Sequence, residues 1–207
     1  MTTFVEIQGE NLAVEIYEPK VRIADVVLVH GFTGSKEDFE VIGPLLADMG
    51  YRVLTFDNRG QHESAHSKRE DAYSMHSLAH DVIELSEHYG FVKPHLLGHS
   101  FGGLVAQRAL VQSPQTWRSL TIFCSGPHWI PDKPDLDATL HILTSMTMEE
   151  SWYKYKDETD KLLPRYETYK KRWMASDPNS THTMALHLKD TQALTAEIVA
   201  TKLPVHV

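Results

Sequence analysis

The segment Gly98-His99-Ser100-Phe101-Gly102 carries residue types and a spacing that suit a nucleophilic serine. In the pattern Gly-x-Ser-x-Gly the serine lies on a sharp turn between a strand and a helix, where larger neighbours would collide with the backbone. An apolar stretch precedes the pattern, helical spacing follows it, and Gly103 adds a further small residue where helix and strand must pack closely. The spacing therefore predicts that Ser100 is a catalytic nucleophile.

A second segment, His30-Gly31-Phe32, ends another apolar run and could supply a partner for this serine. From that position a backbone N–H group can be directed at the point where Ser100 would attack a carbonyl carbon. Together with the N–H group that follows the serine it would form an oxyanion hole, in which a single donor stabilises the transition state by about 3 kcal/mol. We predict that the N–H groups of Phe32 and Phe101 bind the oxyanion.

The elements that must position these residues alternate along the first part of the chain. Apolar runs with strand character lie at 4–18, as two short runs around a turn, and at 25–30, 51–56, 94–97 and 119–124. Helical spacing lies at 36–49, 74–89, 101–112 and 191–201, and a last strand begins at 203–207. Helices between apolar strands predict right-handed crossovers, a mostly parallel sheet with helices on both faces, and ligand chemistry at the carboxyl ends of the strands.

The stretch 127–190 breaks this alternation and contains Trp129, Trp152 and Trp173. We predict that it is a helical lid, inserted between a core at 1–126 and a return to the core at 191–207. Its aromatic side chains could line a substrate pocket or simply pack on the domain, since aromatics dominate both settings. Its excess of basic residues between Lys154 and Arg172 could favour an anionic substrate, but an exposed helix face is the preferred interpretation.

Composition narrows the class of partner. The 207 residues include 20 basic and 28 acidic side chains, a net charge of −8, and 42% are hydrophobic, which is enough for a core. An acidic chain does not suit nucleic acid or anionic lipid, so its partners are expected to be small molecules or proteins. We expect a small-molecule substrate. Neither a signal peptide nor a membrane span is expected. The single cysteine, Cys124, is expected in a buried strand and reduced, which fits a cytoplasmic protein.

Other polar residues are predicted to be structural. His76 and His80, like His62 and His66, are spaced four residues apart, but no third ligand or His-Glu-x-x-His motif accompanies them, so neither a metal nor a cofactor is expected. The pair Asp57 and Arg59 ends a predicted strand. We expect Asp57 to bind backbone N–H groups and the pair to take part in ion pairing rather than in chemistry.

Taken in order, His30-Gly31-Phe32, Asp57-Asn58-Arg59-Gly60 and Gly98-His99-Ser100-Phe101-Gly102-Gly103 resemble the α/β-hydrolase superfamily. The similarity is greatest to small bacterial esterases, lactonases and carbon–carbon-bond hydrolases. It implies an α/β-hydrolase fold with a lid after the sixth strand and a serine nucleophile, in contrast to the aspartate of haloalkane dehalogenases and epoxide hydrolases. The chain departs from the family where Gln61 follows Gly60, since a second glycine is usual there.

The resemblance also implies a catalytic acid after the seventh strand and a histidine base after the eighth. We therefore expect both to lie outside this chain, whose C-terminal strand and helix would be missing. As substitutes, His99 and His206 are disfavoured because a base must reach the nucleophile. Asp132 or Asp135 could be the acid, as some relatives place it there.

Three functions are compatible with these features. The first is a serine hydrolase that forms an acyl-enzyme on Ser100 with a small, partly apolar ester, lactone or related carbonyl compound. The second is a carbon–carbon-bond hydrolase or lyase on the same scaffold, because the stretch 30–35 resembles a menaquinone-pathway member of the superfamily. The third is a truncated, non-catalytic binding protein.

Overall fold

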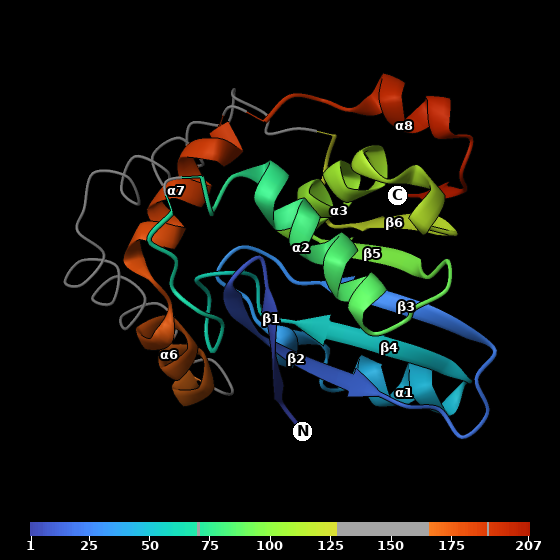
Figure 1. Ribbon diagram of the computed structural model, residues 1–207, viewed down its shortest axis with the longest axis horizontal. Helices are drawn as coiled ribbons and strands as arrows, with labels where there is room; N and C mark the ends of the chain where they lie inside the picture. The colour runs from blue at the N-terminus through green and yellow to red at the C-terminus, as the bar shows by residue number, and fades with distance from the viewer. Residues whose placement is uncertain (70, 128–165, 190) are drawn as a thin grey trace.

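The computed structural model describes residues 1–69, 71–127, 166–189 and 191–207, and seven strands form one sheet in the order β1-β2-β4-β3-β5-β6-β7 (Figure 1). The strands are β1 (Thr3–Ile7), β2 (Glu10–Tyr17), β3 (Ala24–Val29), β4 (Tyr51–Phe56), β5 (His95–His99), β6 (Ser119–Phe123) and β7 (Val205–His206). The β1–β2 and β2–β4 pairs are antiparallel, and every pair from β4 to β7 is parallel. This confirms the predicted mostly parallel sheet.

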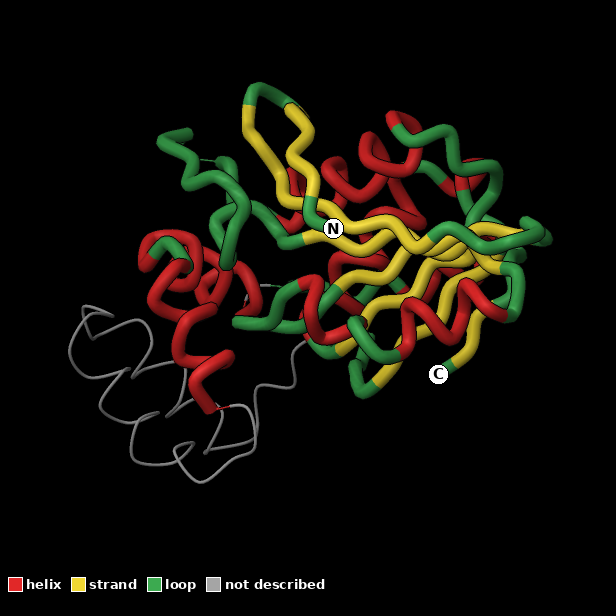
Figure 2. Tube along the Cα trace, turned by 90° about the horizontal axis from the view of Figure 1, so that it is seen from below, coloured by secondary structure: helices red, strands yellow, loops and turns green. Residues whose placement is uncertain are grey.

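Helices lie on both sides of the sheet (Figure 2). The helices α2 (Met75–His88) and α3 (Phe101–Gln112) contact each other, and α8 (Thr195–Thr201) lies against α3. On the other side, α1 (Ile42–Asp48) packs against β4 and β2. Two further helices follow β6, namely α6 (Tyr166–Ala175) and α7 (Pro178–Lys189). Two short 3₁₀ helices occupy Lys36–Phe39 and Pro114–Thr116.

The central strand β3 shows how the sequence fills both layers. Successive side chains of a strand point to opposite faces. Val27 and Val29 belong to the larger apolar core with α2 and α3, whereas Val26 and Leu28 form a smaller cluster with Phe39. A strand that is buried on both faces reads as a continuous apolar run, as the sequence between residues 25 and 30 does.

The helix predicted at 36–49 is wrong in extent. The structure has a 3₁₀ turn at Lys36–Phe39 and a separate α1 that begins only at Ile42. Pro44 is the physical reason, because proline lacks an N–H donor and is tolerated only in the first turn of a helix. Its place as the third residue of α1 prevents one helix from running through the whole segment.

The expectation of a buried Cys124 is also wrong. Strand β6 ends at Phe123, one residue earlier than predicted, and the Cys124 thiol is exposed. Its backbone φ of 50° ends the extended conformation at this residue. The apolar pattern alone could not locate the end of β6, since the turn at Cys124 depends on the path of the loop that follows it.

Most of the predicted lid at 127–190 lies outside the described residues, including Trp129, Trp152, Asp132, Asp135 and the side chain of Trp173. Helices α6 and α7 belong to this stretch and agree with its predicted helical character. In the part of the chain that the structure describes, no helix combines the length and the apolar composition needed to cross a lipid bilayer.

Candidate active site

Ser100 occupies the junction between β5 and α3 with φ 52° and ψ −120°. Residues other than glycine seldom adopt a positive φ. Those that do concentrate at functional sites, where the surrounding structure enforces the strained backbone. Here the Ser100 N–H donates to the Phe123 carbonyl at 2.9 Å, and the Ser100 carbonyl accepts from Gly103 N–H at 2.9 Å. These two hydrogen bonds tie the strained turn to the end of β6 and to the first turn of α3.

The glycines around Ser100 are required by close backbone contacts. A Cβ atom at Gly98 would overlap the Gly102 carbonyl oxygen, and one at Gly102 would overlap the carbonyl oxygens of Val29 and His30. Helix α3 therefore begins directly against the end of β3. The Gly-x-Ser-x-Gly pattern is thus explained by sterics at both of its glycines.

Gly102→Ala is expected to lower both stability and the reactivity of Ser100. Its methyl group would meet backbone oxygens, which cannot rotate away as a flexible side chain can, so the start of α3 must shift. Overpacking of this kind costs about 1–3 kcal/mol. Urea unfolding gives the free-energy loss, and the rate of labelling by a fluorophosphonate gives the loss of reactivity.

The matched control for this variant is Gly90→Ala. Gly90 has a positive φ of 63°, and no atom lies within 4 Å of a Cβ added to it. The control should cost about 1 kcal/mol through its backbone conformation and leave the labelling rate unchanged. Equal labelling rates for the two variants would contradict the assignment of Gly102 to the serine turn.

The segment Gly31-Phe32 lies beside the serine. A Cβ atom built on Gly31 would be 3.3 Å from Ser100 Cβ, and the rings of Phe32 and Phe101 are in edge contact with centroids 5.8 Å apart. Among the described residues, neither Phe32 N–H nor Phe101 N–H has a hydrogen-bond acceptor. Two backbone donors without a described acceptor therefore lie on the two segments that meet at Ser100.

No described histidine is hydrogen bonded to Ser100 Oγ. The neighbouring His99 ring instead packs on the Phe123 ring with centroids 5.6 Å apart, and His206 lies on β7. His30 is fully buried and is bonded to Gly31 and Asn58. A general base for Ser100 is thus not found within the described part of the chain.

A buried ammonium group joins the loops after β3 and β4. Lys36 Nζ lies 3.0 Å from Asp57 Oδ2, 2.9 Å from Glu37 Oε1 and 2.5 Å from Glu63 Oε2. Asp57 also accepts hydrogen bonds from the N–H groups of Lys36 and Glu63 at 2.7 and 3.1 Å. This confirms the structural role predicted for Asp57, although the sequence carried no signal for Lys36 as its partner.

The same loops contain the metal-type ligand set Glu37, His62 and Glu63, whose donor atoms lie within 4.8 Å of one another. The Lys36 ammonium is already bonded to both carboxylates. These contacts and that of His62 hold the pKa of Glu37 well below its usual range, against the effect of burial. The Lys36 ammonium therefore already supplies the positive charge between Glu37 and Glu63, and we assign no metal to this group.

Arg59 forms a second buried pair, with Asp81 of α2. Its Nε and Nη2 atoms donate to the two Asp81 oxygens at 3.1 and 2.5 Å, and neither side chain is more than 1% exposed. This agrees with the structural role predicted for Arg59, although its partner is Asp81 and not a residue of its own loop. Burial raises the pKa of Asp81 to about 6, although the guanidinium opposes the change, so the pair does not fully offset the cost of desolvation.

Helices α6 and α7 contact the loops at the carboxyl ends of β3 and β4. Arg172 Nη1 donates to Asp38 Oδ1 at 2.5 Å, and Ser176 Oγ accepts from His62 N–H at 3.1 Å. Gln61, the residue that departs from the family pattern, directs its amide to Met184 Sδ of α7 at 3.1 Å. Gln61 thus gives this loop a side-chain contact with α7 that a glycine at the same position could not make.

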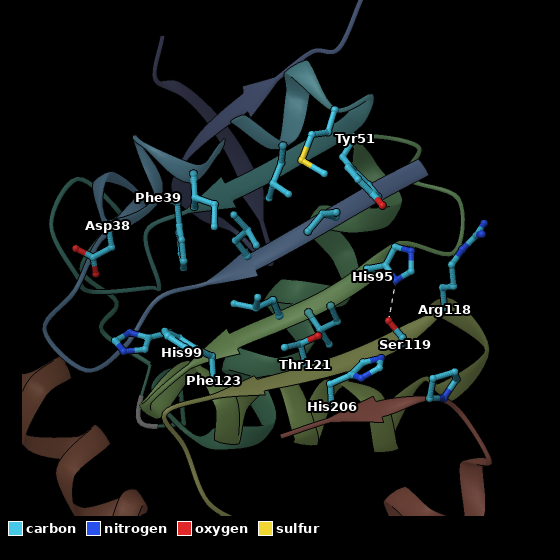
Figure 3. A pocket seen from close by; sticks show the side chains of 18 of the residues that line it. Asp38, Phe39, Tyr51, His95, His99, Arg118, Ser119, Thr121, Phe123 and His206 are labelled. Atoms are coloured by element: carbon cyan, nitrogen blue, oxygen red, sulfur yellow. Dashed lines mark hydrogen bonds between the residues drawn. The ribbon is translucent and has the colours of Figure 1, made fainter. Parts of the chain in front are cut away.

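An apolar groove of about 910 Å³ runs along the sheet face on the α1 side (Figure 3). Its lining includes Val26, Leu28 and Leu97 of the sheet. It extends along β5 and β6 from His95 and Ser119 to His99 and Phe123. His95 accepts from or donates to Ser119 Oγ at 2.7 Å at one end of the groove. Ser100 is not among the described residues that line it, so we keep the groove separate from the candidate active site.

A family model described as alpha/beta hydrolase fold matches residues 26–193. Because this match covers most of the chain, the protein belongs to the alpha/beta hydrolase fold family. The turn at Ser100 and the strand order agree with that membership.

Individual relatives are similar to this chain over different lengths. The uncharacterized hydrolase YugF of Bacillus subtilis is 28% identical over 173 residues, which are 83% of this chain and 54% of YugF. Epoxide hydrolase B of Mycobacterium tuberculosis is 37% identical over 81 residues, 39% of this chain and 23% of that protein. The solved esterase EaEST from Exiguobacterium antarcticum has a TM-score of 0.81 at 19% identity, covering 99% of this chain and 79% of the esterase. The chain thus spans about half the length of YugF and a smaller part of the epoxide hydrolase.

Proposed function

We propose that the protein is a serine hydrolase that acts on a small, partly apolar ester, lactone or related carbonyl compound. The observation that carries the proposal is the strained Ser100 with the unused N–H groups of Phe32 and Phe101 beside it. The esterase name of a structural neighbour and the hydrolase name of YugF are compatible with it.

In the proposed reaction Ser100 Oγ attacks the carbonyl carbon while a histidine base takes the hydroxyl proton. The carbonyl oxygen becomes an oxyanion and accepts hydrogen bonds from Phe32 N–H and Phe101 N–H. The alcohol leaves with the proton from the histidine, and water then cleaves the acyl-enzyme. The proposal places this histidine outside the described residues.

We further propose that the stretch 127–190 is a lid over a core formed by 1–126 and 191–207. The contacts of Arg172 with Asp38 and of Ser176 with His62 support this division, because they bring α6 to the edge of the sheet where Ser100 lies. A lid at this edge would cover the substrate and limit its size.

The test, made on the full-length protein with its histidine base, is an intact-mass measurement before and after treatment with a fluorophosphonate, followed by peptide mapping. One adduct on Ser100 is the expected result. A panel of short acyl esters, lactones and vinylogous diketone acids then identifies the reaction, since turnover of the diketone acids alone would favour carbon–carbon bond cleavage. A folded protein that takes up no probe and turns over no substrate would contradict the proposal and favour a binding protein.

A further inference from the structure

His30 lies beneath the candidate oxyanion hole with its ring fully buried. Its Nε2 atom is 2.9 Å from Asn58 N, and its Nδ1 atom is 2.8 Å from the Gly31 carbonyl oxygen. The Asn58 N–H group can only donate, so Nε2 must be the acceptor. Nδ1 therefore carries the proton and donates it to Gly31 O, which defines a neutral imidazole with one tautomer.

The Gly31 carbonyl belongs to the same peptide group as Phe32 N–H. A trans peptide is planar, so its C=O and N–H bonds point in opposite directions. The hydrogen bonds from His30 Nδ1 and from Gly34 N–H, at 2.8 and 3.1 Å, hold the oxygen end of this plane. They thereby set the direction of the N–H end, beside Ser100.

The ring is itself held from the other side of the site. The Asn58 N–H bond ties it to the loop after β4, and the His30 carbonyl oxygen lies against Gly102 of the serine turn. A Cβ atom at Gly34 would lie 3.0 Å from Nδ1, so the loop is closed tightly around the imidazole. His30 is thus in contact with the Gly31–Gly34 loop, with the loop after β4 and with the serine turn. The first and the last of these segments carry the N–H groups proposed to bind the oxyanion.

We propose that His30 is a positioning residue for catalysis, whose imidazole fixes the Gly31–Phe32 peptide plane so that Phe32 N–H points at the oxyanion on Ser100. This inference rests on the proposed serine hydrolase function and assigns the buried imidazole a part in it. His30 itself does not touch the substrate.

Burial lowers the pKa of His30 below its usual 6.5, which favours the neutral ring that the geometry requires. The charges that act on it are Asp57 and Asp38, which raise the pKa, and Arg172, which lowers it. Since the unfolded chain takes up the proton first, the stability that His30 contributes is complete above about pH 6.5 and is lost as the pH falls toward the lowered folded-state value. The difference in free energy of unfolding between wild type and His30→Asn should therefore shrink on acidification, as measured by urea unfolding at several pH values.

Two substitutions separate the two bonds of the ring. His30→Asn retains an amide donor near the position of Nδ1 but loses the acceptor for Asn58 N–H. His30→Gln offers an oxygen near the position of Nε2 but loses the donor to Gly31 O. If the peptide plane matters, His30→Gln should lower the maximal inactivation rate by a fluorophosphonate by about 100-fold with its binding constant within threefold, and His30→Asn should lose less.

The matched control is His95→Asn, at the opposite end of β5, which should react like wild type. A folded His30→Gln variant that reacts within twofold of wild type would overturn the inference while leaving the serine hydrolase proposal intact. A wild-type protein that does not react would overturn both. Should His30→Gln fail to fold, ¹⁵N NMR of the wild-type His30 imidazole tests the inference instead. A neutral ring protonated at Nδ1 is the expected result, and protonation at Nε2 near pH 7 would overturn the inference.

Discussion

Replacing Ser100 with alanine should abolish labelling by a fluorophosphonate and lower turnover of any ester substrate by about 10⁴-fold or more. The reason is that the proposed reaction proceeds through a bond to Ser100 Oγ, and water held in the same place is a far weaker nucleophile. The alanine side chain fits wherever serine does, so the fold should be unaffected. Intact mass and initial rates on the best ester of the panel measure the two effects, and circular dichroism confirms folding.

Ser125→Ala is the matched control, because this serine follows β6 at the same edge of the sheet. It should be labelled at Ser100 with the wild-type mass increase. Turnover by Ser100→Ala that remains within tenfold of wild type would contradict a serine nucleophile. An adduct on another residue in the variant would show that the probe reacts without an activated serine.

Asp81→Ala should lower the free energy of unfolding by about 3–5 kcal/mol. The change leaves the Arg59 guanidinium, which is fully buried, without its bidentate partner. An unpaired buried charge costs far more than the pair contributes, because the desolvation penalty is no longer offset. Urea unfolding followed by circular dichroism gives the difference, provided that the slope with urea is unchanged.

The double variant Arg59→Met with Asp81→Leu tests whether the unpaired charge causes the loss of stability in Asp81→Ala. Replacing both charges with apolar side chains of similar size is often neutral, so most of the lost stability should return. A double variant no more stable than Asp81→Ala would show that packing, rather than the unpaired charge, accounts for the loss. A loss below about 1 kcal/mol for Asp81→Ala would contradict the burial of Arg59.

The serine turn and the positions of the central strands could be predicted because their signals are local. Glycines at positions 98 and 102 are needed whatever surrounds them, and the apolar runs of β3 and β4 match their observed bounds within one residue. The α/β class follows from the alternation of apolar strands and helices, since helices must cover both faces of a parallel sheet. The family is indicated separately, by the resemblance of three motifs. The same reasoning placed Phe32 beside Phe101, although they are distant in sequence.

The polar contacts around the site could not be predicted in the same way. Lys36 is fully buried because three carboxylates from two loops surround it, and nothing in its neighbours along the chain indicates this. The role of Gln61 depends on Met184, more than a hundred residues away. Such pairs become visible only when the loops have been placed by the sheet.

The contacts of α6 and α7 also bear on the order in which the protein folds. Arg172 and Asp38 are 134 residues apart, and His62 and Ser176 are 114 apart, whereas β3 pairs with β4 and β5 across much shorter stretches. Closing a long loop costs more chain entropy and slows the formation of the contacts that depend on it. The central sheet can therefore form first, and the edge of the site that α6 and α7 contact is completed last.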